Sequence, residues 1–342
     1  MDQHKTPLFT QMTALCQSKP ASFHVPGHKS GRIADEEARR FFQQVMQIDF
    51  TELTGLDDLH HPEGVIKEAE ELAARCFGAE QTFFLVGGST AGNLALILSL
   101  CGKDDILIVE RSVHKSVIHG LMLAGAKAVF LPSRIDERTG LAGGVRLEDV
   151  KTALCRYPEA KGVFLTHPNY YGMGVDLAPI AAFLHAHGKP LLIDEAHGAH
   201  FGFHPELPAS ALQQGADAAV QSTHKMLTAL TMGAMLHVQG RLLPRENVAT
   251  VLSMLQTSSP SYPIMASLDL ARREMAVAGR ERLEAGLRAV RVFERQMERL
   301  PRFAVFPGQT SSPYETKDPF KVLVRDESGQ LSGYELHKQL ER

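Results

Sequence analysis

Short apolar segments of strand length alternate with helical patterns along most of the chain, and this alternation limits the possible fold more than any other feature. Seven such segments are expected to form strands, at 82–86, 106–109, 128–131, 162–166, 190–194, 217–221 and 233–238. Apolar residues at helical spacing lie at 65–77, 91–100, 116–124, 147–155 and 177–187. Buried strands that alternate with helices are typical of a mostly parallel sheet. We therefore predict an α/β fold with a seven-stranded sheet and helices on both faces.

Polar residues follow the carboxyl ends of these strands. They lie at 88–90, 111–114, 166–171, 194–197 and 222–225. In open α/β sheets a ligand binds at this edge, just beyond the ends of the strands. These segments also hold most of the chemically reactive side chains, so the sequence predicts a functional site there.

The turn Gly87-Gly88-Ser89-Thr90 joins the first of these strands to an apolar helix. Backbone N–H groups and two hydroxyls at a helix N-terminus can bind a phosphate. A tight turn in which Ser89 or Thr90 caps the helix explains the same residues equally well. The turn is neither a Walker loop nor a dinucleotide fingerprint, because it lacks both glycine patterns.

Three other side chains at this edge become informative only when they are taken together. Lys225, in Gln221-Ser222-Thr223-His224-Lys225, offers an amine that condenses with an aldehyde once it is neutral, although a lone lysine is usually a solvated loop residue. Asp194 ends an apolar strand and can pair with a protonated pyridine nitrogen, or can serve as a helix cap or structural ion pair. His114 can stack on a flat ring, or be an ordinary hydrogen-bonded histidine. With the phosphate site, these groups indicate pyridoxal 5'-phosphate.

Composition excludes several classes of partner. The formal net charge of −3 provides no basic field for a phosphate backbone, so nucleic acid is not expected. The longest apolar run, Leu94–Leu100, is far shorter than the roughly 20 residues of a membrane span, and no signal-type segment opens the chain. We expect a cytoplasmic protein with no membrane partner. The four cysteines form no C-x-x-C pair, which predicts free thiols.

The chain is expected to divide into three parts. These are an N-terminal segment (1–48), a cofactor-binding large domain (49–260), and a connecting helix with part of a smaller α+β domain (261–342). The third part begins with a long charged helical pattern from Pro263 to about Leu300 and continues with short strands at 303–306 and 321–324. An amphipathic helix from Gly333 follows without an evident closing element. We therefore predict that the smaller domain is incomplete.

Seven motifs extend over nearly the whole large domain. They are HVPGHKSG (24–31), DFTELTGLDDLHHPEGVIKEAEELAARCFGA (49–79), FFLVGGSTAGN (83–93), RSVHKS (111–116), THPNYYG (166–172), LIDEAHGAH (192–200) and QSTHKML (221–227). Together they make the chain resemble the Orn/Lys/Arg decarboxylases, which are pyridoxal phosphate enzymes of the aspartate-aminotransferase-like superfamily. It is most similar to the short form without an N-terminal regulatory domain, since the motifs begin almost at Met1. Family chains continue well past the point where this one ends.

The resemblance implies a role for each residue of the predicted site. Lys225 would form the Schiff base with the cofactor, and Asp194 would pair with its pyridinium nitrogen. His114 would stack on the ring, while Ala196 and His197 would lie along its edge or face. The resemblance assigns the phosphate to Gly88, Ser89, Thr90, Ser222 and His224. Family members often have Gly-Thr-Ser at 88–90, and the exchange here keeps both hydroxyls.

The activity that the resemblance implies is decarboxylation of arginine, lysine or ornithine to an amine of the polyamine pathway. The family also implies at least a homodimer, with residues that cross into the partner's site. An aminotransferase or a β-eliminating lyase would use the same Lys225 and Asp194. A truncated homologue without activity is a further alternative, because the small domain helps to close the site in this family.

A zinc hydrolase built on His197, His200 and His204 with Asp194 is the weakest alternative. The spacing falls on a strand-to-loop segment, so the side chains need not share a metal-facing side. We therefore predict no metal.

Overall fold

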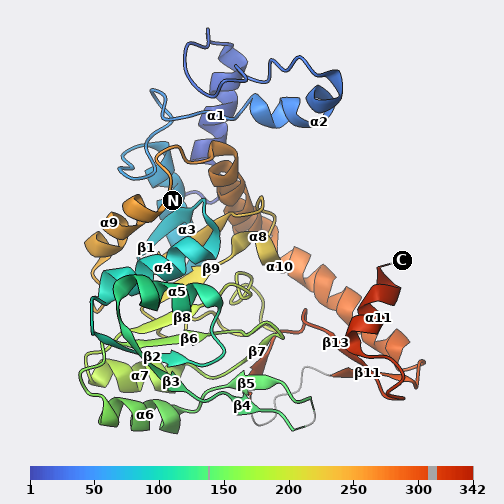
Figure 1. The fold of residues 1–342 in the computed structure, drawn as a ribbon. Helices are drawn as coiled ribbons and strands as arrows, with labels where there is room; N and C mark the ends of the chain where they lie inside the picture. Colours follow the sequence, from blue (N-terminus) through green and yellow to red (C-terminus); the bar gives the residue numbers. More distant parts are fainter. Residues whose placement is uncertain (138, 307–313, 342) are drawn as a thin grey trace.

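The structure is a computed structural model that describes residues 1–137, 139–306 and 314–341. At its centre lies a seven-stranded sheet in the order β1-β10-β9-β8-β6-β2-β3 (Figure 1). Its strands are β1 (Gln81–Leu85), β2 (Ile106–Glu110), β3 (Lys127–Leu131), β6 (Val163–Thr166), β8 (Leu191–Asp194), β9 (Ala218–Gln221) and β10 (Ala234–Val238). These are the seven segments predicted from the sequence, and each end differs from its prediction by at most one residue.

The direction of the strands fixes where polar side chains can gather. The five neighbouring strands from β9 to β3 are all parallel, whereas β10 runs antiparallel to both of its neighbours. The carboxyl ends of the parallel strands therefore lie at one edge of the sheet. Asp194 pairs in register with Thr166 on one side and with Val220 on the other, which places the end of β8 in the middle of this edge.

Helices cover both faces of the sheet, as predicted. The helices that follow β1 in the large domain are α4 (Gly88–Leu100), α5 (Lys115–Ala124), α6 (Leu147–Arg156), α7 (Ala178–Ala186), α8 (Thr223–Met226) and α9 (Arg245–Leu255). Leu191 and Ile193 of β8 belong to a core that includes residues of α6 and α7. Leu192, between them, points into a second core with α4, α5 and α9. This alternation is the period of two that a strand buried on both faces requires. The sequence prediction missed α9.

Helix α4 packs unusually close to the sheet. A Cβ atom at Gly92 would lie 2.7 Å from Val220 Cγ1 and 2.9 Å from Leu85 Cδ1, so a larger residue would push the helix away. Since α4 begins directly after β1, this contact also fixes the N-terminus of α4 at the carboxyl edge of the parallel strands.

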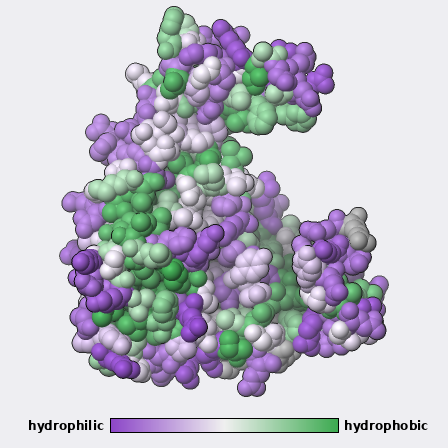
Figure 2. Space-filling view, in the orientation of Figure 1, coloured by the Kyte–Doolittle hydropathy of each residue, from purple (hydrophilic) through white to green (hydrophobic). Residues whose placement is uncertain are grey.

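Two of the helices that precede β1 pack against the long helix α10 (Tyr262–Met297). Helices α1 (Pro7–Ser18) and α3 (Val65–Phe77) contribute Leu8 and Ile66 to a core that also contains Met265. Helix α2 (Glu36–Met46), which the sequence prediction missed, projects from the body of the protein and buries none of its residues (Figure 1). Its Phe41 is 76% exposed and its Phe42 is 55% exposed. Figure 2 shows apolar surface gathered along this projecting helix.

The last part of the chain forms a small sheet and a helix. Strand β11 (Phe303–Phe306) pairs with β13 (Leu323–Asp326), and α11 (Gly333–Leu340) follows; the prediction had started the second strand at residue 321. Strand β12 (Thr316–Lys317) instead pairs with β7 (Met173–Gly174) of the large domain. A short hairpin of β4 (Arg134–Ile135) and β5 (Ala142–Gly144) completes the strands of the described chain. The domain boundaries at residues 49 and 261 remain a prediction.

Two other expectations concern the whole chain. Across the described ranges, no helix combines the length and the apolar character needed to cross a bilayer. Cys16, Cys76, Cys101 and Cys155 are all free thiols.

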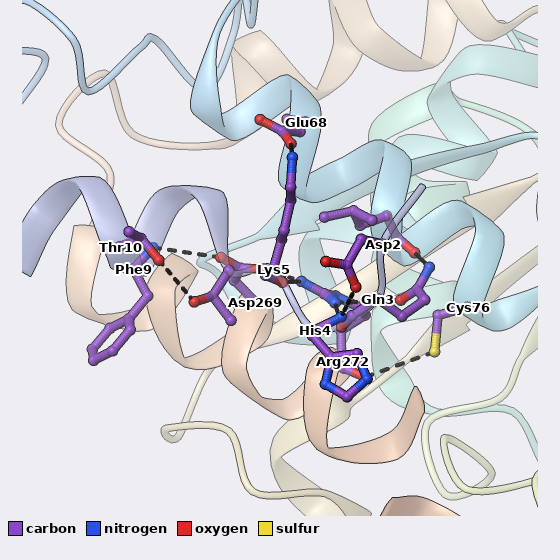
Figure 3. A network of polar contacts seen from close by, with 12 residues as sticks. Asp2, Gln3, His4, Lys5, Phe9, Thr10, Glu68, Cys76, Asp269 and Arg272 are labelled. Carbon is purple, nitrogen blue, oxygen red and sulfur yellow. Dashed lines mark hydrogen bonds and ion pairs between the residues drawn. The ribbon is translucent and has the colours of Figure 1, made fainter. Parts of the chain in front are cut away.

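A buried ion pair ties the N-terminus to α10 (Figure 3). The guanidinium of Arg272 donates to Asp269 Oδ1 at 2.6 Å, and both side chains are fully buried. It also donates to the backbone carbonyls of Gln3, at 2.7 Å, and Lys5, at 2.6 Å. Gln3 in turn donates to the carbonyl of Leu72 in α3, at 3.1 Å. One guanidinium therefore holds three segments that are distant in sequence.

We predict that Arg272→Ala lowers the free energy of unfolding by about 3–5 kcal/mol, because it leaves the Asp269 carboxylate buried without its partner. Urea unfolding followed by circular dichroism measures this loss. Arg280→Ala, at an exposed position of the same helix, should change the free energy by less than about 0.5 kcal/mol. The double variant Asp269→Leu/Arg272→Met should recover most of the loss; an equal loss in the double variant would contradict the ion-pair explanation.

Candidate active site

Asp194 is the buried centre of a polar network at the carboxyl edge of the sheet. Its side chain is only 2% exposed. Asn93 Nδ2 of α4 donates to Asp194 Oδ2 at 2.8 Å, and the backbone N–H of Ala196 donates to Oδ1 at 3.1 Å. Burial raises the pKa of this carboxyl, whereas the two hydrogen bonds and the nearby Lys225 and His114 lower it. The arrangement provides a desolvated carboxylate with its orientation fixed.

His114 joins the same network through Ser116. Its Nδ1 accepts the backbone N–H of Ser116 at 3.2 Å at the start of α5, and it lies 2.8 Å from the Ser116 hydroxyl. That hydroxyl also accepts a hydrogen bond from Asn93 Nδ2, at 2.9 Å. Asn93 therefore connects Asp194 to the residue that orients His114. Burial lowers the pKa of His114, with the carboxylate of Asp194 opposing the shift, which favours a neutral ring at pH 7.

Lys225 lies on α8, one turn beyond the end of β9, and its side chain is exposed. Its Nζ is 3.4 Å from His197 Nε2. Partial burial lowers the pKa of Lys225; the carboxylate of Asp194 opposes this, and the positive charge of Lys321 adds to it. A lysine whose pKa is lowered has a larger fraction of reactive neutral amine. Asp194, Lys225 and His114 are thus close enough to influence one another's ionisation.

The predicted phosphate site lies at the N-terminus of α4. The N-cap residue of this helix is Gly87, which has no side chain to accept from the first turn, so N–H groups there are not capped by it. The hydroxyl of Ser222 donates to that of Ser89 at 2.8 Å, so these two hydroxyls converge across 133 residues of sequence. Thr90 is exposed beside them. The Gly88 N–H is already bonded to the Met232 carbonyl, at 2.9 Å.

His224 is less free to hold a phosphate than the other residues of this set. Its Nδ1–H donates to the carbonyl of Gly233 at 3.0 Å, so only Nε2 remains for another partner. Ser222 is fully buried, and so is Thr223, whose hydroxyl has no hydrogen-bond partner among the described residues.

These features fit pyridoxal 5'-phosphate. An uncapped helix N-terminus with converging hydroxyls suits a phosphate, a buried carboxylate suits a pyridinium nitrogen, and an amine of lowered pKa suits an aldehyde. The groups lie at one edge of the sheet, where the sequence had placed them. The individual role of each residue remains a prediction.

The sequence analysis missed Asn93 and Lys321. Asn93 lies within the quoted FFLVGGSTAGN motif, and a polar residue in an otherwise apolar helix could have identified it. Lys321 lies far outside the predicted site in sequence, yet its Nζ is 3.4 Å from His197 Nδ1. No local pattern predicts this contact, because it depends on how the last part of the chain folds back.

The histidines of the zinc alternative have separate partners. His197 lies between Lys225 and Lys321, His200 Nε2 is 3.1 Å from Asp318, and His204 Nε2 is 3.1 Å from Glu284. Within the described ranges, the only group with metal-ligand spacing is His204, Glu206 and Glu284, and it includes neither Asp194 nor the other two histidines. Arg291 already pairs with both of these glutamates.

We predict that Asn93→Ala lowers the free energy of unfolding by about 1–3 kcal/mol at neutral pH, because Asp194 loses a donor while it stays buried. Burial already raises the folded-state pKa of Asp194 above its unfolded value. Protonated Asp194 therefore contributes to the free energy of unfolding below its unfolded-state pKa. This contribution is lost as the pH rises through its folded-state pKa. Loss of the Asn93 donor raises the folded pKa further, so the deficit should be larger at neutral pH than in mild acid.

Urea unfolding over a pH series measures the effect. Ser116→Ala is the matched control, since it removes the second acceptor of Asn93 but leaves the bond to Asp194. A deficit in Asn93→Ala that does not change with pH would contradict this role.

Comparison with known proteins identifies the family. A sequence profile of the Orn/Lys/Arg decarboxylase major domain matches residues 6–335. The uncharacterized protein YaaO of Bacillus subtilis (strain 168) is 45% identical over 340 residues, which are 98% of this chain and 70% of that protein. An arginine decarboxylase of the same organism is 38% identical over 343 residues, which are 99% of this chain and 70% of that protein.

Solved structures give the same result. Lysine decarboxylase A from Pseudomonas aeruginosa superposes with a TM-score of 0.82 at 26% identity, over 95% of this chain and 52% of that chain. This chain thus spans about half the length of that solved decarboxylase. The profile match and the relatives together establish that the chain belongs to the Orn/Lys/Arg decarboxylase family of amino acid decarboxylases.

Proposed function

We propose that this chain carries out the pyridoxal phosphate-dependent decarboxylation of a basic amino acid. The observation that carries the proposal is the convergence of the Lys225 amine, the buried Asp194 carboxylate and the uncapped N-terminus of α4 at one edge of the sheet. Membership in the decarboxylase family supports the reaction type. The aspartate-aminotransferase-like fold alone would not, because the same fold carries other chemistries.

When bound, pyridoxal 5'-phosphate supplies an aldehyde and a pyridine ring that accepts the electrons left by loss of carbon dioxide. Asp194 would hold a proton at the ring nitrogen, and Asn93 and Ala196 keep its carboxylate oriented for this role. His114 would cover a face of the ring. Lys225 would hold the cofactor covalently through its amine and would be released when the substrate amine takes its place.

The remaining residues bind and orient. Ser89, Thr90 and Ser222 would hold the phosphate with the first turn of α4, and His224 offers only its Nε2. His197 lies beside the Lys225 amine and would border the reacting carbon. Burial, followed by the charges of Lys225 and Lys321, lowers the pKa of His197 to about 4. It is therefore a neutral hydrogen-bonding group at pH 7.

Arginine is the substrate that we propose first. An arginine decarboxylase is among the relatives that cover nearly the whole chain, and a further one from Bacillus anthracis is 42% identical over 83% of it. Lysine and ornithine are the other candidates, and the product would be an amine that enters polyamine synthesis. Carbon dioxide release from each of the three amino acids would distinguish them.

We further infer that the chain assembles with a second copy of itself. Helix α2 supports this inference, because it exposes Phe41, Phe42 and Val45 and buries none of its residues within the described chain. An apolar helix face of this kind is typical of a protein interface.

We predict that Lys225→Ala abolishes covalent attachment of pyridoxal 5'-phosphate and lowers kcat by about 10³-fold or more, because the remaining amine beside His197, that of Lys321, lies at the opposite ring nitrogen. Borohydride reduction followed by peptide mapping identifies the attachment site in the wild-type chain. Lys103→Ala, in an exposed loop after α4, should attach cofactor normally. Cofactor attached to any lysine other than Lys225 would refute the assignment.

Asp194→Asn should retain the cofactor but lower kcat by roughly 10²–10³-fold, since a neutral amide cannot hold the proton at the ring nitrogen. The absorbance of bound cofactor and the rate of carbon dioxide release, measured on the same preparation, separate binding from chemistry. Near wild-type turnover in this variant would mean that Asp194 is only structural.

A further inference from the structure

The segment from Tyr314 to Lys321 folds back onto the large domain. Its strand β12 pairs with β7, and the N–H of Asp318 donates to the carbonyl of Gly172 at 2.7 Å. The Asp318 carboxylate lies 3.1 Å from His200 Nε2, and both side chains are fully buried. The ring of Phe320 packs against that of His200, with centroids 5.5 Å apart. This part of the chain is therefore a fixed wall of the site.

Lys321 ends this segment and reaches the site beside His197. Its Nζ lies 3.4 Å from His197 Nδ1 and 5.8 Å from the centroid of the Tyr170 ring. A Cβ at Gly172, which has a φ of +80°, would lie 2.7 Å from the Lys321 side chain, so only glycine leaves room for it. Among the described residues, no carboxylate oxygen lies within 4.0 Å of the Lys321 amine. Its positive charge is thus directed at the site.

The imidazole of His197 faces a lysine amine at each nitrogen. Nε2 is 3.4 Å from Lys225 Nζ, and Nδ1 is 3.4 Å from Lys321 Nζ. A neutral imidazole has one N–H and one lone pair, whereas an ammonium group only donates. One of the two lysines can therefore be an ammonium that donates to the lone pair. The other must be a neutral amine that accepts the ring N–H.

The surroundings decide which lysine is which. Lys321 lies over the face of the Tyr170 ring, which favours a cation. The charged or titratable groups that face Lys225 are Asp194 of β8, His114 before α5, His197 after β8, and Lys321. Asp194 favours the charged form of Lys225, but its oxygens are already bound by Asn93 and Ala196. Burial and Lys321 favour the neutral form, and the pKa of Lys225 is lowered overall.

We propose that Lys321 is a positioning residue for Lys225: its ammonium donates to His197 Nδ1 and so fixes the tautomer whose Nε2–H is donated to the Lys225 amine. The segment from Tyr314 to Lys321 thereby keeps the Lys225 nitrogen unprotonated and holds it in place through the hydrogen bond from His197. The inference rests on the proposed function for its purpose, since it assumes that Lys225 is the reactive amine. Its test measures the protonation of Lys225 and the tautomer of His197, and needs neither turnover nor cofactor.

Competitive labelling with acetic anhydride measures the ionisation of single lysines. The full 342-residue chain, freed of cofactor, is labelled over a pH series, and the peptide that contains Lys225 is quantified by mass spectrometry. In Lys321→Met the midpoint of Lys225 labelling should rise by about one pH unit, because a like charge is removed. Lys321→Arg should keep the wild-type midpoint. Lys338→Met, which removes a positive charge from exposed α11, should also leave it unchanged.

An unchanged midpoint in Lys321→Met, or an equal rise in Lys321→Arg, would overturn the proposal. The second measurement is the ¹⁵N spectrum of the histidine-labelled wild-type chain, in which His197→Gln assigns the His197 signals. We expect the Nε2–H tautomer; an Nδ1–H tautomer would overturn the proposal even if Lys321→Met failed to fold. Absence of carbon dioxide release from all three amino acids would contradict the proposed function but would not change the labelling or ¹⁵N results, so the two proposals can fail separately.

Discussion

A carboxylate buried at the end of a central parallel strand is the constraint on which this site depends. Burial of an unpaired charge is costly, so Asp194 needs hydrogen-bond donors to stay ionised. Asn93 and the Ala196 N–H supply the donors, and they come from elements that meet only when α4 packs directly on the sheet. The absence of a side chain at Gly92 allows that close packing. The geometry of the core and the chemistry of the site are therefore linked through one helix.

Much of the large domain could be predicted because its signals are local. Each strand is a short buried apolar run that ends at a polar residue or a turn, so the seven segments were found almost to the residue. The candidate site followed from the same logic, since parallel strands bring their carboxyl ends to one edge. Their positions directly after strands predict that Asp194, Lys225 and His114 lie near one another, and in the structure the charge of Asp194 influences the pKa of both Lys225 and His114.

The contacts between distant segments could not be predicted in this way. Asn93 and Asp194 are 101 residues apart, and His197 and Lys321 are 124 apart, so no sequence period relates them. Helix α2 is different, because its signal is local: Asp35 caps the helix, and Phe41, Phe42 and Val45 lie at helical spacing. The pairing of β12 with β7 involves only two residues of each strand, which is too short for an alternating pattern. Such features depend on tertiary packing rather than on local propensity.

The return of the segment from Tyr314 to Lys321 has a consequence for the order in which the site is built during synthesis. A ribosome completes the last strand of the central sheet at Val238, well before it reaches Lys321. For that interval the emerging polypeptide has the sheet edge with Asp194 and Lys225 but lacks the wall that contacts His197. The nascent protein therefore passes through a stage in which Lys225 is present and accessible, while Lys321, on the other side of the His197 ring, has not yet been translated.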